Sequence, residues 1–374
     1  MGKPRHLLHA FSTFAVGGPE VRSCDLINHF GERYRHTIIA MDGRYECQSK
    51  LLPGVPVTFL EVENHRQNLL KNVQQFARLL KQLKPDVLLT YNWGSIEWGL
   101  ANSLSRVCPQ LHWEEGFAPE EVVRQKKRRI YARRLFLSGV QQLIVPSRVL
   151  ERIAQQVWKF PASRVSYVPN GVDVARYSRS FSPPHNLLVT PELAKVQGSL
   201  LVGTVATLRK EKNIPRLIRA FRQAATLIDA KLVIVGGGPE YQALWQMVQE
   251  YGLTEKVILL GYKDDPAEIV KCFDVFAISS DTEQMPISVL EAMAAGCPVV
   301  GTDVGDIKEM LAPSNQTFLC PTTNEAAFVT NLQRLLTEPD LRTTLGQQNH
   351  VRCHELFDKS VMYRNYEGLY EVRL

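Results

Sequence analysis

Two glutamates eight residues apart, Glu283 and Glu291, lie in the stretch of sequence richest in groups that could bind a ligand. This stretch, 279–310, is predicted as a strand end, a polar loop that carries Glu283, and a helix that carries Glu291. The N-terminus of such a helix has free backbone N–H groups and favours an anion. A carboxylate on the helix can accept hydrogen bonds from vicinal sugar hydroxyls. Each glutamate alone would be read as a surface acid; together they predict a site for an anion and a sugar.

Parallel sheets are expected to position these groups, because both halves of the chain alternate short buried strands with amphipathic helices. Ligands of such sheets bind at the carboxyl ends of the strands. A Ser- and Pro-rich segment, 177–199, is predicted as an interdomain linker with a surface loop. The predicted strands are 36–41, 55–62, 86–92, 141–147, 200–208, 231–237, 256–262, 274–280 and 297–304, and the predicted helices include 66–83, 214–228, 287–295 and the C-terminal segment 356–374.

The length of 374 residues suggests two domains, and no apolar run reaches the roughly 18 to 20 residues that cross a bilayer. The N-terminus lacks the features of a secretory signal. Seven scattered cysteines include no C-x-x-C pair, which argues against disulfides and a zinc site and favours a reducing compartment. We therefore expect a cytoplasmic protein, with peripheral contact at the inner membrane face as a further option.

The net charge of +6 is modest, but seven of the 44 basic residues lie in the segment 124–134, RQKKRRIYARR. One interpretation is a solvated helix face. The other is a surface for anionic lipid head groups or a polyanionic substrate. Nucleic acid is not an expected partner, because no recognised nucleic-acid motif accompanies the segment.

Several further motifs accompany the two glutamates: VGGPEV (16–21), VPNGVD (168–173), GTVATLRKEKN (203–213), VGGGPE (235–240) and LLGYKDD (259–265). With Glu283-x7-Glu291 and the EAMAAGCPVVGTDVG that follows, the chain resembles the family-4 retaining glycosyltransferases of the GT-B fold. It looks most similar to bacterial enzymes of exopolysaccharide and lipopolysaccharide synthesis. The resemblance implies an α/β protein with two Rossmann-like domains facing a central cleft. The implied domains are 1–174 together with a C-terminal helix, 356–374, that crosses back to the first domain, and 175–355.

The resemblance also implies roles for individual residues. Glu291 would bind the ribose hydroxyls of a nucleotide-sugar donor, and Glu283 would contact the transferred sugar. Lys212 would clamp the diphosphate, where a cation stabilises the charge that develops on the leaving group. Gly17 and Gly18 would let the first domain's backbone approach the phosphates without a Cβ clash. Further implied donor contacts are Gly237, Tyr262, Lys263, Met285, Pro286, Ile287 and Ser288.

Two departures from the family pattern concern the implied catalytic set of Glu283, Lys212, His112 and Arg209. The family usually has an arginine where this chain has Thr207, so Arg209 could reach in its place or be an exposed loop cation. His112 is the nearest match to a family histidine near the donor sugar. A structural histidine is the other interpretation, and Glu114 and Glu115 are alternatives at this place, 111–121.

No metal or cofactor is expected. The chain has no D-x-D pair and no P-loop, and Tyr241 stands where a dinucleotide-binding G-x-G-x-x-G would need its last glycine. The resemblance implies the retaining transfer of a sugar from a nucleotide-diphosphate sugar to a glycan or lipid-linked glycan, and the missing D-x-D pair favours transfer without a metal ion. The alternative is a catalytically weak, glycosyltransferase-like module that binds a nucleotide sugar or glycan.

Overall fold

A computed structural model of the chain describes residues 3–65, 68–116, 125–179, 193, 198–226 and 228–371. The contacts divide the chain into two units, Met1–Pro169 with Tyr363–Leu374 (unit 1) and Asn170–Met362 (unit 2). The domain boundaries predicted near residues 174 and 356 thus lie a few residues from the boundaries between these two units. Most of the predicted linker, 177–199, lies outside the described residues. No helix in the described ranges is both long and apolar enough to span a membrane.

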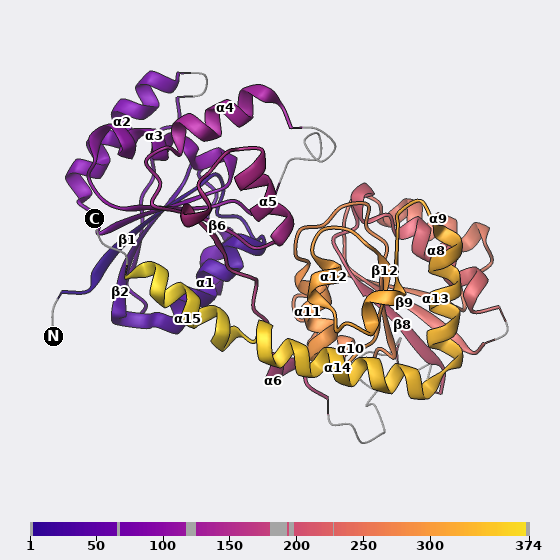
Figure 1. The fold of residues 1–374 in the computed structure, drawn as a ribbon. Coiled ribbons are helices and arrows are strands. Elements are labelled where there is room, and N and C mark those ends of the chain that lie inside the picture. Colours follow the sequence, from indigo (N-terminus) through magenta and orange to yellow (C-terminus); the bar gives the residue numbers. More distant parts are fainter. Residues whose placement is uncertain are drawn as a thin grey trace. The chain divides into compact units, whose positions relative to one another are not determined.

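Unit 1 is built on a seven-stranded parallel sheet with the order β3-β2-β1-β4-β5-β6-β7 (Figure 1). The order reverses direction at β1, as in Rossmann-like folds. Four of its strands were predicted, whereas the structure has seven. The strands are β1 (Arg5–Phe11), β2 (Tyr34–Ala40), β3 (Val57–Phe59), β4 (Val87–Tyr91), β5 (Gln110–Trp113), β6 (Gln142–Val145) and β7 (Val165–Tyr167).

Strand β1 was missed because two histidines interrupt its apolar pattern. Both are fully or almost fully buried. The His6 ring lies 2.8 Å from the Thr37 hydroxyl, and the His9 ring lies 2.9 Å from the ring of His36. Burial and the charge of Arg35 lower the pKa of His6 to about 4, so it is a neutral core residue at pH 7.

Helices cover both faces of this sheet. α2 (Leu69–Leu83) and α3 (Ile96–Ser105) bury Phe76 and Trp98 against one face. α1 (Gly18–Phe30) lies on the opposite side of the sheet (Figure 1). The unit also contains α4 (Lys127–Phe136) and α5 (Arg148–Gln156).

The end of the last helix, α15 (Lys359–Tyr370), belongs to unit 1 although it follows unit 2 in the chain. Trp113 on β5 donates a hydrogen bond of 3.0 Å to the Tyr366 hydroxyl. The rings of His29 and Tyr363 stack with centroids 3.7 Å apart. These contacts confirm that the C-terminal helix returns to the first domain (Figure 1).

Unit 2 contains a six-stranded parallel sheet with the order β10-β9-β8-β11-β12-β13. The two parallel sheets with flanking helices confirm the predicted α/β architecture with two Rossmann-like domains. All five strands predicted for this half are present, with shorter bounds. The strands are β8 (Leu200–Val205), β9 (Ala230–Val235), β10 (Val257–Gly261), β11 (Val275–Ile278), β12 (Val299–Thr302) and β13 (Leu319–Cys320).

Two apolar layers enclose this second sheet. One contains α8 (Ile214–Ala224), α9 (Tyr241–Glu250) and α13 (Glu325–Thr337). The other contains α6 (Val174–Tyr177), α10 (Ala267–Val270), α11 (Ile287–Ala294), α12 (Ile307–Met310) and α14 (Pro339–Phe357). Since both faces are covered, ligands have access mainly at the ends of the strands.

Candidate functional site

Three loops meet at the carboxyl edge of the sheet in unit 2, because β8, β11 and β12 are parallel and follow one another in that sheet. The loop after β8 ends in a 3-10 turn, Lys210–Lys212. The Ser279 hydroxyl, after β11, donates to the Lys212 carbonyl at 3.0 Å. The Asp306 amide, after β12, donates to the Gln284 carbonyl at 2.8 Å. These bonds fix the loop that carries Glu283.

Lys212 and Glu283 form an ion pair across the first two loops. The Lys212 Nζ lies 2.6 Å from Glu283 Oε1, and the Ser280 hydroxyl donates to the same oxygen at 2.7 Å. The side chains are 24% and 10% exposed. The structure thus brings together two predicted catalytic residues and leaves the cation partly open to solvent.

The loop around Glu283 is supported from two sides. Gly305 has φ +59°, and a Cβ there would lie 2.4 Å from the Glu283 carbonyl oxygen, so only glycine fits. Arg216 on α8, almost fully buried, donates to the Ser279 carbonyl and pairs with Asp281 at 2.8 Å. Because these contacts hold the loop on both sides, we expect the loop that carries Glu283 to keep one conformation.

The N-terminus of α11 follows directly. Pro286 precedes the helix, and no side chain caps it. Met285 and Pro286 are buried, whereas Ile287 is 37% exposed and Ser288 is half-buried. Asn170 donates its side-chain amide to the Met285 carbonyl at 3.1 Å. Uncapped N–H groups at this end can bind an anion.

Glu291 lies on the same helix and is partly buried. Its Oε1 accepts a hydrogen bond of 2.7 Å from the Tyr177 hydroxyl on α6. Burial raises the pKa of this carboxyl, while Tyr177 and the charge of Arg176 oppose that rise.

The glycine loop after β9 packs closely on the loop after β8. Gly236 and Gly238 have φ of +145° and +154°, and a Cβ at either would overlap a carbonyl oxygen of Ala206 or Leu208. A Cβ at Gly237 would instead lie 3.4 Å from the Tyr262 Cβ. Gly237 thus lies directly against Tyr262, within van der Waals distance of an added Cβ.

Four residues of the neighbouring loops, among them the two predicted to hold the base, are at least partly exposed. Tyr262 is 68% exposed and Lys263 is half-buried. Thr207 and Arg209 are both exposed. The exposed position of Arg209 matches the loop-cation interpretation and leaves its catalytic role a prediction.

In unit 1, Gly17 and Gly18 lie at the N-terminus of α1, which has no side-chain cap. Glu20 covers Gly17 so closely that a Cβ there would lie 2.6 Å from its Oε2. Burial raises the pKa of Glu20 to about 7, and the charge of Glu115 adds to the rise. No functional role was predicted for Glu20 from the sequence. Its position within the VGGPEV motif is the sequence feature that could have indicated one.

His112 does not reach the surface of unit 1. It is fully buried in β5, with Nδ1 2.8 Å from the Thr90 hydroxyl and Nε2 3.6 Å from Glu114. This burial matches the structural interpretation and does not support contact with a donor sugar. Glu114 is also buried, paired with Arg133 at 3.1 Å. Although burial alone would raise the pKa of Glu114, His112 and Arg133 hold it below its usual range.

Glu115, the other alternative at this place, pairs with the guanidinium of Arg22 on α1. Both side chains are largely buried. The pair gives Glu115 a structural role between β5 and α1. Of the 111–121 segment, residues 117–121 lie outside the described ranges.

The basic segment 124–134 divides into structural and surface residues, with Arg124 outside the described ranges. Arg133 is buried with Glu114, and Arg134 donates to the carbonyls of Val157 and Trp158. The surface of α4 carries exposed basic side chains beside Tyr131 (64% exposed) and Leu135 (62% exposed). The exposed basic residues are Lys127 and Arg128 on α4 and Lys126, which directly precedes it.

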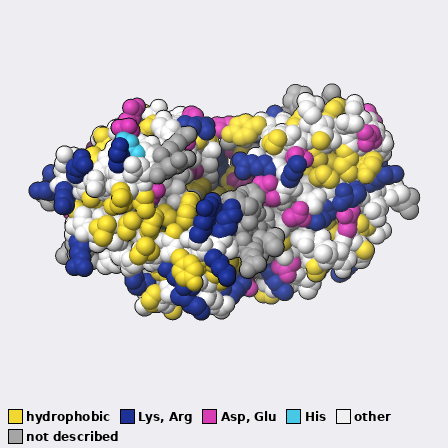
Figure 2. All heavy atoms as spheres, turned by 90° about the horizontal axis from the view of Figure 1, so that it is seen from above, with side chains coloured by type: hydrophobic (Ala, Val, Ile, Leu, Met, Phe, Trp, Pro, Cys, Tyr) yellow, Lys and Arg dark blue, Asp and Glu magenta, His cyan; other side chains and the backbone are white. Residues whose placement is uncertain are grey.

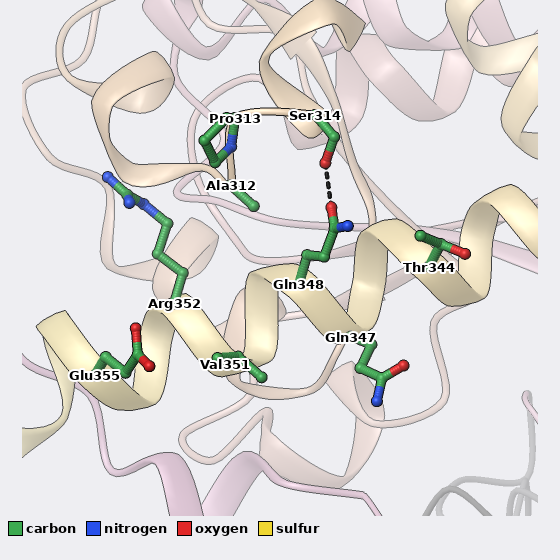
Figure 3. A pocket seen from close by; sticks show the side chains of 9 residues that line it. All are labelled: Ala312, Pro313, Ser314, Thr344, Gln347, Gln348, Val351, Arg352 and Glu355. Atoms are coloured by element: carbon green, nitrogen blue, oxygen red, sulfur yellow. Dashed lines mark hydrogen bonds between the residues drawn. The ribbon is translucent and has the colours of Figure 1, made fainter.

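Unit 2 also has a shallow hollow of about 670 Å³ along α14, between that helix and residues 312–314. Figure 3 shows Gln347, Gln348 and Val351 on its helical side, with Gln348 bonded to Ser314. None of the predicted donor residues lines it. Among the described residues, no group of three His, Cys, Asp or Glu side chains is arranged to hold a metal.

Two family profiles match this chain. Residues 16–176 match Glycosyltransferase Family 4, and residues 190–352 match Glycosyl transferases group 1. The first range contains the loop before α1, and the second contains Lys212, Glu283 and Glu291. The chain belongs to the family 4 glycosyltransferases.

Curated relatives of this family 4 chain act on different substrates. It is 30% identical over 166 residues to the N-acetyl-alpha-D-glucosaminyl L-malate synthase of Bacillus anthracis, covering 44% of each chain. It is 26% identical over 277 residues to the UDP-Gal:alpha-D-GlcNAc-diphosphoundecaprenol alpha-1,3-galactosyltransferase of Escherichia coli, covering 71% of this chain and 70% of that enzyme. The chain thus spans less than half the length of the Bacillus relative.

Solved structures of the same fold cover nearly the whole chain. HepE of Anabaena, solved with UDP, has a TM-score of 0.82 at 18% identity, with 98% of this chain and 100% of that chain covered. The lipopolysaccharide outer core galactosyltransferase WaaB has a TM-score of 0.73 at 17% identity, covering 97% and 98%. These likenesses confirm the GT-B fold.

Proposed function

We propose that this family 4 chain transfers a sugar, with retention of anomeric configuration, from a nucleotide-diphosphate sugar to a hydroxyl of a glycan or lipid-linked glycan. The observation that carries the proposal is the Lys212–Glu283 pair beside the uncapped N-terminus of α11, the helix that also carries Glu291. A cation, free helix amides and a carboxylate are the groups that a diphosphate and a ribose require.

In this proposal, the residues of unit 2 act mainly on the leaving group. As the bond between the sugar C1 and the phosphate oxygen breaks, negative charge grows on the nucleoside diphosphate. Lys212 and the amides at the start of α11 stabilise that charge. Glu283 orients the sugar, and Glu291 holds the ribose hydroxyls.

Retention follows if the acceptor attacks from the face that the phosphate leaves. The acceptor oxygen bonds to C1, and its proton passes to the departing phosphate oxygen, so the step balances without a separate base. This scheme needs neither His112, which is buried, nor a metal ion.

UDP is the first nucleotide to test. HepE of Anabaena has been solved with UDP and with UDP-glucose, and the E. coli relative is named for a UDP-Gal donor. That enzyme and a Campylobacter jejuni relative are both named for diphospho-undecaprenol-linked acceptors, which supports a lipid-linked glycan as acceptor.

A turnover assay with UDP-, GDP- and ADP-linked sugars and a mixture of lipid-linked glycans tests the proposal. We expect release of one nucleoside diphosphate together with labelled product, at least tenfold slower in Lys212→Ala. Arg219→Ala, which breaks an ion pair between α8 and α13, is the matched control. Tight binding of a nucleotide sugar without turnover would favour the binding-module alternative, and no binding would contradict both.

We further propose that α4 contacts an anionic membrane surface, where a lipid-linked acceptor would lie. Lys127 and Arg128 are exposed beside Tyr131 and Leu135, a combination suited to an anionic interface. Figure 2, viewed from the side on which α4 lies in Figure 1, has Lys and Arg side chains next to hydrophobic ones.

Liposome flotation tests this surface. Binding should require acidic lipid, weaken with added salt, and fall several-fold in the Lys127→Ser/Arg128→Ser variant. Equal binding to neutral and acidic vesicles would favour the solvated-face interpretation.

A further inference from the structure

Tyr177 contributes a buried hydroxyl to the predicted donor site from outside the motifs that define the family. It ends α6, a single turn that Asp173 caps by accepting a hydrogen bond from the Arg176 amide. The Tyr177 side chain is 6% exposed and packs in the same apolar cluster as Val289 and Leu290 of α11. Packing therefore fixes the ring, and the ring fixes where its hydroxyl points.

That hydroxyl lies 2.7 Å from Glu291 Oε1. A neutral phenol donates one hydrogen bond and leaves the carboxylate its charge, whereas a lysine or arginine here would neutralise it. A carboxylate has about four acceptor positions, so the Tyr177 bond leaves others for a ligand. Burial and the neighbouring Glu291 charge both raise the pKa of Tyr177, which keeps the phenol protonated as a donor.

A second contact holds α6 beside the site. Arg176 Nη2 lies 2.6 Å from Asp265 Oδ2, and Asp265 Oδ1 accepts from the Ala267 amide at the start of α10. These side chains are about half exposed, so the pair contributes little stability by itself. It does limit the rotation of the short turn that carries Tyr177.

We propose that Tyr177 is a positioning residue that orients the Glu291 carboxylate toward the ribose hydroxyls of the donor nucleotide. The inference rests on the proposed function, since Glu291 matters here only if a nucleotide binds. Tyr177 acts through Glu291 and does not touch the reacting atoms. Its effect on affinity must therefore disappear when either Glu291 or the ribose hydroxyls are removed.

Calorimetric titration with UDP and with 2′,3′-dideoxyuridine diphosphate tests this coupling. Tyr177→Phe keeps the packed ring and removes only the hydroxyl. We expect UDP to bind Tyr177→Phe roughly three- to tenfold more weakly than the unchanged protein, the effect of one hydrogen bond. The same substitution should change neither the affinity for the dideoxy nucleotide nor the UDP affinity of a Glu291→Ala background.

Tyr251→Phe, at the end of α9, is the matched control and should bind UDP normally. A thermal melt of each variant shows that the titrations measure folded protein. Equal losses for UDP and the dideoxy nucleotide, or no loss at all, would overturn the role of Tyr177. If the unchanged protein binds none of UDP, GDP and ADP, the proposed function fails and this inference with it. Nucleotide binding that Glu291→Ala leaves unchanged overturns this inference and the ribose role of Glu291, but not the proposed sugar transfer.

Discussion

Replacing Glu283 is expected to strengthen nucleotide binding, whereas replacing a residue of a binding site usually weakens it. The reason is the ion pair between Glu283 and Lys212. In the ligand-free protein Glu283 neutralises the cation that we propose for the diphosphate. Glu283→Gln removes that competition and one negative charge from the anion site. We therefore expect this variant to bind a free nucleoside diphosphate more tightly, while it transfers sugar more slowly.

The size of the effect follows from the geometry of the pair. Two unit charges 2.6 Å apart attract by about 6 kcal/mol at an effective dielectric constant of about 20. The cost of desolvating side chains that are 24% and 10% exposed cancels most of this. A net change of about 1 to 2 kcal/mol remains, which corresponds to roughly five- to thirtyfold in affinity.

Calorimetric titration of UDP, GDP and ADP measures the affinity, and a turnover assay measures the transfer. Glu325→Gln is the matched control, because it breaks the Arg219–Glu325 pair elsewhere in unit 2 and should leave the affinity unchanged. Weaker nucleotide binding by Glu283→Gln, or a gain that the control shares, would refute the competition argument.

Three further predictions follow from the same structure. Glu291→Ala should weaken nucleotide binding by about 1.5 to 3 kcal/mol, measured by titration, and unchanged affinity would remove Glu291 from the site. Burial raises the pKa of Glu20 from 4.5 to about 7, so the folded protein holds this proton more tightly than the unfolded chain. The free energy of unfolding should fall by about 3 kcal/mol as pH rises through 4.5 to 7, and Glu20→Gln should remove this dependence in urea titrations, unlike the exposed Glu32→Gln. Because the sequence has no D-x-D pair, turnover should persist in excess EDTA, and an absolute need for manganese or magnesium would contradict the role of Lys212.

The architecture could be predicted from the sequence wherever a local pattern of apolar residues marks a strand or a helix. The strands of unit 2 are continuous apolar runs, as expected for strands buried on both faces, and all five predicted ones are present. Strand β1 was missed because a buried neutral histidine looks polar in a hydropathy pattern. The 19-residue helix α14 was also missed, since its composition shows only a weak apolar stripe.

The candidate site could be predicted only in part for a similar reason. The spacing of Glu283 and Glu291, and the match of Lys212 to a family motif, indicated three residues that lie on loops and a helix at one sheet edge. Contacts between distant segments leave no such signal. The Tyr177–Glu291 bond joins residues 114 apart in the chain, and the burial of His112 depends on neighbours from β4 and α4.

A crystal structure of the protein with its preferred nucleoside diphosphate tests the central claim most directly. Our account predicts the diphosphate at Lys212 and the N-terminus of α11, with the ribose hydroxyls within hydrogen-bond distance of Glu291. A nucleotide bound elsewhere on unit 2, for instance in the hollow along α14, or a ribose that does not contact Glu291, would contradict it.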